Sequence, residues 1–181
     1  MAHDVIFGAR LSDHTPLPSP TMSPTPTDDA AAWHRRFASE CDNRAWQLAE
    51  AASRSAAEDA EMLDAAHAAA LHWRAVGTEL HAARATMLLA HVHALLGHGA
   101  LALPYARASF AFVTSHESAD WEVAFAHAIL ANAAAAAHDA AMHERHYAQA
   151  KTLGAALADA EERAIFDATF CRIPPPSGGA A

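Results

Sequence analysis

The chain has 181 residues, 52% of them apolar, and a formal charge of −9 at pH 7. This size and composition predict one globular domain with a single core. Nucleic-acid binding is disfavoured, because phosphate recognition needs a basic stripe and no basic cluster here is larger than Arg35–Arg36. The sequence shows no signal-peptide pattern and no uncharged apolar run of the roughly 18 residues that a membrane span needs, so we expect no membrane partner.

The two cysteines, Cys41 and Cys171, lie far apart in the sequence and form no C-x-x-C pair. A disulfide framework or a metal-binding thiol pair would need closer or more numerous cysteines. We therefore interpret both as reduced thiols and take the cytoplasm as the default compartment.

Both ends of the chain have the composition of irregular segments. Residues 11–27 hold five prolines among serines and threonines, so residues 1–27 are predicted to be a disordered tail. Within this tail, the apolar segment Val5–Ile6–Phe7 is a candidate to dock on the domain or on a neighbouring chain, and a floppy terminus is the alternative. At the other end, Pro174–Pro175–Pro176 begins a disordered tail over residues 174–181.

Residues 28–173 are predicted to be one all-helical domain. Ser55 and Glu58 have the spacing of a capping box, and Met62, Ala66, Ala69 and Trp73 follow at helical intervals. We expect Ser118 to cap the fifth helix and Pro104 to lie in the first turn of the fourth, with a break near residues 41–43 as an open alternative for the first. Short connectors then make consecutive helices antiparallel neighbours. The predicted helices span residues 28–53, 55–77, 78–97, 100–115, 118–137, 140–155 and 159–173.

A self-comparison aligns the segment beginning Leu89–Ala90 with the segment beginning Leu130–Ala131, 41 residues later. The pattern resembles the tetratricopeptide repeat, in which a small residue follows a leucine and a glycine ends the first helix. Gly97 has that glycine position, and His138 replaces it in the next unit. Further residues match positions of the second repeat helices: Ala102, Ala106 and Ser109 in one unit, and His143, Tyr147 and Ala150 in the next.

The resemblance implies helical hairpins stacked into a right-handed superhelix, whose first helices line a concave groove. A compact seven-helix bundle of another topology is the alternative. Carried over from the family, the groove positions are Asn43, Trp46, Glu50, Arg84, Met87, His91, Phe125, Ala128 and Asn132. Such a surface suits a peptide or a small acidic ligand, because arginine pairs with carboxylates. Alternatively, Arg84 pairs with an acidic neighbour and the aromatic residues belong to the core.

The fourteen histidines raise the question of a metal or ligand site. Asp139, His143 and His146 fall on one helical face, at a spacing compatible with three ligands of zinc or another divalent cation. No fourth ligand is evident, and scattered histidines that simply face solvent are the alternative. A second candidate pocket would combine His67, His72, Arg84 and His91 between the first three helices.

We find no P-loop, no G-x-S-x-G and no complete H-E-x-x-H motif, and no cofactor is implied. Cys41 and a distant histidine could in principle act as nucleophile and base, but nothing in the sequence brings them together. The leading hypothesis is a non-catalytic scaffold that binds a protein or peptide. The alternatives are a small-molecule or divalent-metal-binding domain, catalytic or not, and a homodimer whose groove is filled by the tail or by a second copy.

Overall fold

The computed structural model describes residues 26–177, which fold into seven α-helices without a strand. This confirms the predicted all-α class. Most of the predicted N-terminal tail, including Val5–Phe7, lies outside the described residues, as do residues 178–181. The helices are α1 (Pro26–Ala49), α2 (Ala56–Val76), α3 (Glu79–Leu95), α4 (Gly99–Ser115), α5 (Asp120–Ala136), α6 (Ala140–Ala156) and α7 (Ala160–Phe170).

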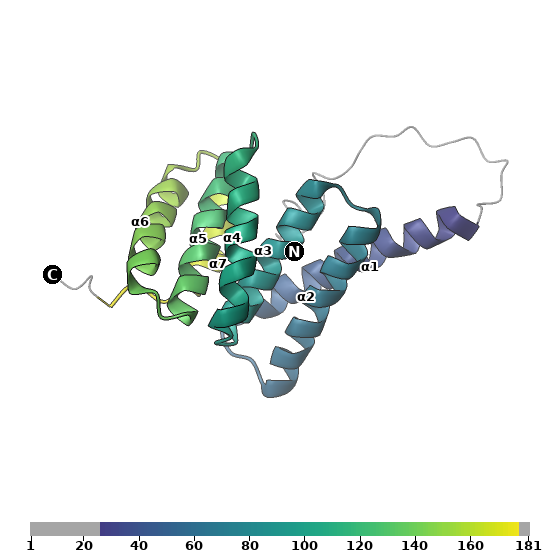
Figure 1. The fold of residues 1–181 in the computed structure, drawn as a ribbon, viewed down its shortest axis with the longest axis horizontal. Helices are drawn as coiled ribbons and strands as arrows, with labels where there is room; N and C mark the ends of the chain where they lie inside the picture. Colours follow the sequence, from purple (N-terminus) through teal and green to yellow (C-terminus); the bar gives the residue numbers. More distant parts are fainter. Residues whose placement is uncertain (1–25, 178–181) are drawn as a thin grey trace.

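The helices pack as successive antiparallel hairpins in two layers (Figure 1). Each of α1 to α6 packs against the next helix in the chain. In addition, α3 contacts both α1 and α5, and α7 packs on α5 and α6. Helices α1, α3, α5 and α7 therefore form an inner layer, and α2, α4 and α6 form an outer layer. The N-terminal end of α1 projects past the other helices.

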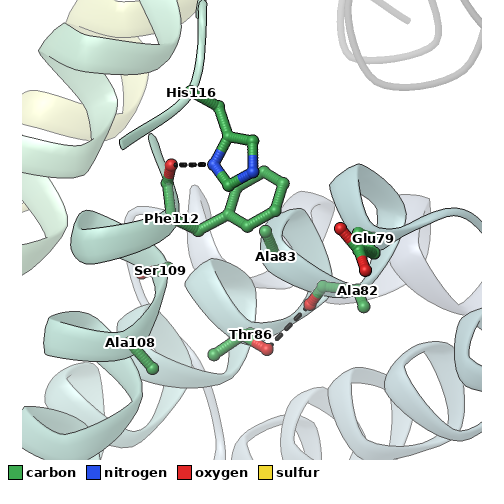
Figure 2. Close-up of a pocket in the computed structure, with 8 residues that line it drawn as sticks. All are labelled: Glu79, Ala82, Ala83, Thr86, Ala108, Ser109, Phe112 and His116. Carbon is green, nitrogen blue, oxygen red and sulfur yellow. Dashed lines mark hydrogen bonds between the residues drawn. The ribbon is translucent and has the colours of Figure 1, made fainter. Parts of the chain in front are cut away.

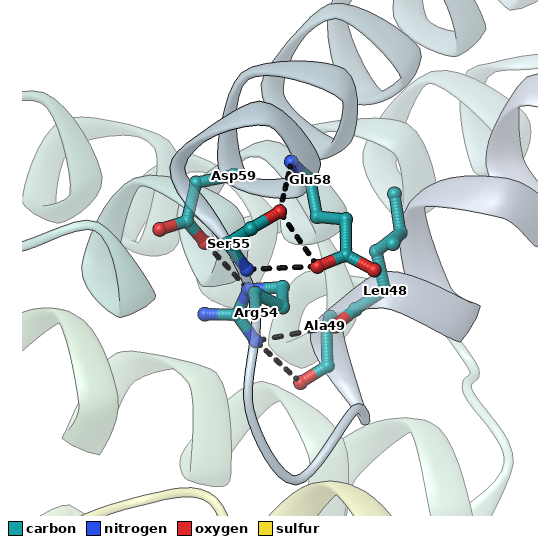
Figure 3. A network of polar contacts seen from close by, with 6 residues as sticks. All are labelled: Leu48, Ala49, Arg54, Ser55, Glu58 and Asp59. Atoms are coloured by element: carbon teal, nitrogen blue, oxygen red, sulfur yellow. Dashed lines mark hydrogen bonds and ion pairs between the residues drawn. The ribbon is translucent and has the colours of Figure 1, made fainter.

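The connection between α1 and α2 is held by a polar network at the start of α2 (Figure 3). Glu58 Oε2 accepts the Ser55 backbone N–H at 2.8 Å, and Ser55 Oγ accepts that of Glu58 at 3.3 Å. The predicted capping box is thus confirmed. Arg54 donates to the Leu48 carbonyl at 3.1 Å and pairs with Asp59 at 2.6 Å. Its side chain therefore links the last turn of α1 to the first turn of α2.

Two helix ends separated by 41 residues have the same backbone geometry. Gly97, after α3, has a φ of 74°, and His138, after α5, has a φ of 59°. Each follows a helix that closes in a Schellman turn, in which the next residue donates its N–H to a carbonyl five residues earlier. These bonds join His98 to His93 at 2.8 Å and Asp139 to Ala134 at 2.9 Å.

Two helices are shorter than the sequence predicted. Helix α1 is continuous through residues 41–43 but ends at Ala49, because Arg54 takes carbonyls of its last turn as acceptors. Helix α7 ends at Phe170 rather than at the proline run.

Two local predictions were wrong in the region of α4 and α5. Ser118 is not a cap, because its Oγ donates to the Val113 carbonyl at 2.9 Å and Ala119 holds the N-cap position. Pro104 lies five residues after Gly99 and therefore in the second turn of α4. It is exposed, so water can serve the carbonyl that the missing N–H leaves.

Alanine dominates the core and lets the helices approach closely. Gly154 of α6 lies against the ring of Phe166, where an added methyl group would have no room. The largest fully buried side chains in the described part of the chain come mostly from the inner layer and include Trp46, Leu88, Phe125, Ile129, Ile165 and Phe166. The core therefore extends onto the face where a groove was predicted.

Candidate functional site

The residues predicted to line a concave groove meet on the inner layer, but they are buried. The Trp46 and His91 rings stack with centroids 5.5 Å apart, and Phe125 meets Trp46 edge-on at 6.3 Å. Asn132 Nδ2 lies within hydrogen-bonding distance of His91 Nδ1, at 3.0 Å. These four side chains are at most 3% exposed. The repeat offset thus identified neighbours correctly, although they form a packed face.

The remaining groove positions extend this inner face toward its two ends. Met87 is buried and Asn43 is half-buried. Phe125 meets Phe166 of α7 edge-on, with ring centroids 5.6 Å apart. Thr169 Oγ1 lies 3.5 Å from Glu50 Oε1, so the last helix reaches the first across this face.

Arg84 is held by an acidic neighbour, as one of the sequence alternatives proposed. Its guanidinium donates to Glu122 Oε1 at 2.9 Å and lies 5.2 Å from the Trp121 ring centroid. Both charged side chains are largely buried, at 15% and 7% exposure. Because Glu122 compensates the charge of Arg84, this arginine is poorly placed to recognise an acidic ligand.

Glu122 and Trp121 were missed as neighbours of Arg84 in the sequence. A signal for Glu122 was nevertheless present, since it precedes by three residues, about one helical turn, the position 41 residues after Arg84. The repeat offset therefore predicts this pairing once one turn of freedom is allowed.

The structure separates the two α2 histidines from the inner face. His72 Nδ1 lies 2.8 Å from Nδ1 of His34 in α1. His67 is exposed, and its ring approaches His93 edge-on at 5.5 Å. The other two members of the candidate pocket lie on the inner layer, so the four side chains are not assembled around one cavity.

The three candidate metal ligands of α6 also have different partners. Asp139 caps the helix, and His143 Nε2 donates to the Pro174 carbonyl at 2.8 Å. His146 Nδ1 lies 3.0 Å from His127 Nδ1. Within residues 26–177, no group of three or more His, Cys, Asp or Glu side chains is arranged to hold a metal.

His127 and His146 form a pair between α5 and α6 that the sequence did not reveal. Phe110 of α4 meets both rings edge-on, at 4.9 and 5.2 Å. Burial, followed by the charges of His127 and Arg145, lowers the pKa of His146 to about 4. Burial also lowers the pKa of His127. Both rings are therefore neutral near pH 7.

An open groove of about 410 Å³ lies between α3 and α4 (Figure 2). Alanines from both helices make up much of its wall, and Phe112 adds an aromatic side chain. The His116 ring stacks on Phe112 with centroids 4.1 Å apart, and His116 Nδ1 donates to the Phe112 carbonyl at 2.8 Å. The lining residues are Glu79, Ala82, Ala83, Thr86, Ala108, Ser109, Phe112 and His116.

Polar groups inside this groove are largely satisfied by their own helices. Thr86 Oγ1 donates to the Ala82 carbonyl at 2.7 Å, and Ser109 Oγ donates to the Ala106 carbonyl at 3.1 Å. The exposed Glu79 carboxylate brings negative charge to the groove. The groove therefore offers an apolar surface with one acidic group.

A second, shallower groove of about 680 Å³ lies on α1 and α2 and includes Cys41. Burial, with the nearby charges of Glu40 and Asp42, raises the pKa of the Cys41 thiol. A thiol with a raised pKa is a poor nucleophile at neutral pH. Arg44, which also lines this groove, is paired with Glu61 at 2.7 Å.

Comparison with protein-family models, curated proteins and solved structures finds no match to this chain. The tetratricopeptide resemblance therefore stays a prediction, and the function has to be argued from the site itself. In the part of the chain that the structure describes, no helix combines the length and the apolar character that crossing a bilayer requires.

Proposed function

We propose that this chain is a non-catalytic binding scaffold that holds a peptide segment of a partner protein in the α3–α4 groove. The observation that carries the proposal is the contrast between the two candidate surfaces. The predicted groove positions on the inner layer are largely filled by aromatic packing, whereas the surface between α3 and α4 is open. Binding sites are typically concave and mostly apolar with a few placed polar groups.

Pairing on the inner layer supports a structural role for it. Arg84 is compensated by Glu122, and His91 lies beside Asn132. Buried polar groups that are paired within the protein need no ligand to offset their desolvation. This weakens the case for a small acidic ligand, which the sequence had suggested.

The chemistry of the α3–α4 groove favours an apolar peptide that carries a basic side chain. Alanine side chains allow a peptide backbone to come close, and Phe112 provides apolar contact area. Glu79 would attract a lysine or arginine, and the net charge of −9 would steer a basic partner toward the protein. Stacked helical hairpins are a common framework for such binding, which fits the predicted tetratricopeptide resemblance.

The test is to select peptides that bind the full-length chain from a random display library, and to measure their affinities by fluorescence polarisation. Ala108→Trp fills the groove, whereas Ala111→Trp changes an exposed alanine of the same helix outside it. We expect the selected peptides to be apolar and basic, and to lose binding to Ala108→Trp while keeping it to Ala111→Trp.

Far-UV circular dichroism of both tryptophan variants checks that each remains folded. If selection yields no peptide, or if every selected peptide binds Ala108→Trp as tightly as the wild type, the α3–α4 groove is not the binding surface.

A further inference from the structure

The projecting end of α1 carries an exposed aromatic patch. Trp33 and Phe37 are 46% and 40% exposed, and their rings stack with centroids 5.6 Å apart. The ring of His72 from α2 lies 5.6 Å from Phe37, and Leu71 beside it in sequence is 56% exposed. Large apolar side chains that cluster on a surface mark an interaction site more often than single ones do.

Charged residues extend the same helical stripe in both directions. Asp29 precedes Trp33 by four residues, and Arg36 follows it by three, so the side chains lie on neighbouring positions of one face. The Arg36 guanidinium lies 5.4 Å from the Trp33 ring centroid and pairs with Glu40 at 2.7 Å. Asp29 and Arg36 are both exposed. The stripe is thus acidic at one end, aromatic in the middle and basic toward the other end.

This order of charges makes the stripe complementary to itself when it is reversed. If two copies of α1 cross antiparallel at Trp33, Asp29 of each copy faces the region of Arg36 and Phe37 in the other. A two-fold axis generates every such contact twice, because the same surface serves both partners. The two tryptophans then cover one another, and two Asp29–Arg36 pairs flank them.

We propose that the chain forms a homodimer through antiparallel packing of the α1 stripe Asp29–Trp33–Arg36–Phe37. The α3–α4 groove belongs to other helices, so the dimer is independent of the proposed peptide binding. The α1 stripe is chosen over a docking site for a foreign partner because its acidic and basic ends match each other.

Charge reversal provides a test that separates pairing from misfolding. Asp29→Arg places like charges opposite Arg36, and Arg36→Asp places like charges opposite Asp29. Each variant alone should be monomeric in light scattering across a concentration series, whereas the wild type should approach twice the 19.1 kDa chain mass. An equimolar mixture of the two variants restores both opposite-charge pairs and should regain the dimer.

Two further variants test the aromatic centre. Trp33→Ala together with Phe37→Ala should abolish the dimer, whereas Leu101→Ala, at a 54% exposed leucine of α4, should leave it unchanged. Circular dichroism confirms that each variant is folded.

Several results would overturn the proposal. A wild-type chain that stays monomeric at every concentration rules out self-association and leaves the patch to another partner. A dimer that survives loss of both aromatic rings uses a different surface. Failure of the mixed charge variants to reassociate excludes the antiparallel register.

Discussion

At the scale of single residues, His138 has a backbone conformation that suits glycine better. Its φ of 59° places it in the left-handed region, as Gly97 is 41 residues earlier. A side chain in this region crowds its own backbone, at a cost of about 1–2 kcal/mol. Glycine avoids this crowding but loses more conformational entropy on folding.

We therefore predict that His138→Gly raises the free energy of unfolding by about 0.5 kcal/mol. The reverse type of change, Gly97→Ala, should lower it by about 1 kcal/mol, since no neighbouring atom lies within 4 Å of the added carbon and only the backbone conformation is affected. Urea unfolding of both variants measures these changes. A destabilised His138→Gly would show that the His138 side chain has a stabilising role that outweighs its backbone conformation.

The same scale sets the limit on predicting the site. The 41-residue offset placed Trp46, His91 and Asn132 on one layer, because repeated helices present equivalent positions to the same side. It did not predict that these side chains fill the layer themselves. That outcome depends on how closely the hairpins approach, which small residues in several helices determine together.

At the scale of the helices, capping residues carried most of the information about where elements begin. Ser55 and Asp159 cap α2 and α7 as the sequence predicted, because each presents a side-chain oxygen to free N–H groups of a first turn. Ser118 failed as a predictor, since its hydroxyl bonds backward to α4 instead of forward to α5. A hydroxyl beside a helix end has both options, and tertiary packing selects between them.

The α2 cap yields a prediction at this scale. Ser55→Ala removes the oxygen that accepts the Glu58 N–H, and should lower the free energy of unfolding by about 1 kcal/mol. Ser53→Ala, at an exposed position of the same connection, is the matched control and should have a much smaller effect. Thermal unfolding compares the two. Equal melting temperatures for both variants would mean that the hydrogen bonds of Arg54 suffice to hold this connection.

The α3–α4 groove could not be predicted from helix positions. Ala82 and Ala108 are ordinary helix-forming residues, and nothing in their local sequence marks them as part of a binding surface. The groove exists because neither helix fills the space between these alanines. Such a space follows from tertiary packing, so only the structure revealed it.

At the scale of the whole molecule, histidines lie at contacts between helices as well as on the surface. His34 and His72 join α1 to α2, and His127 and His146 join α5 to α6. Burial is the largest cause lowering the pKa of His81, His93, His127 and His146. The folded chain therefore binds protons at these rings less readily than the unfolded chain does.

This distribution predicts that stability falls in acid. The pKa of His146 is about 4 in the folded chain, against its model value of 6.5. Between these two pH values the unfolded chain takes up a proton that the folded chain does not, so the free energy of unfolding decreases as the pH is lowered from 6.5 to 4. His146→Gln should flatten this dependence, whereas Gln149→Ala, at an exposed position of the same helix, should leave its slope unchanged. Parallel curves for the wild type and His146→Gln would contradict the assignment.

The central claim is that the α3–α4 groove is the binding surface of this scaffold. Its most direct test is a titration of the isotope-labelled full-length chain with a selected apolar, basic peptide, followed by amide chemical shifts. We predict that the largest shifts occur in residues 79–86 and 108–116, on the two walls of the groove. Largest shifts around Trp46, His91 and Asn132, with the groove unaffected, would contradict the account and return the binding site to the inner layer.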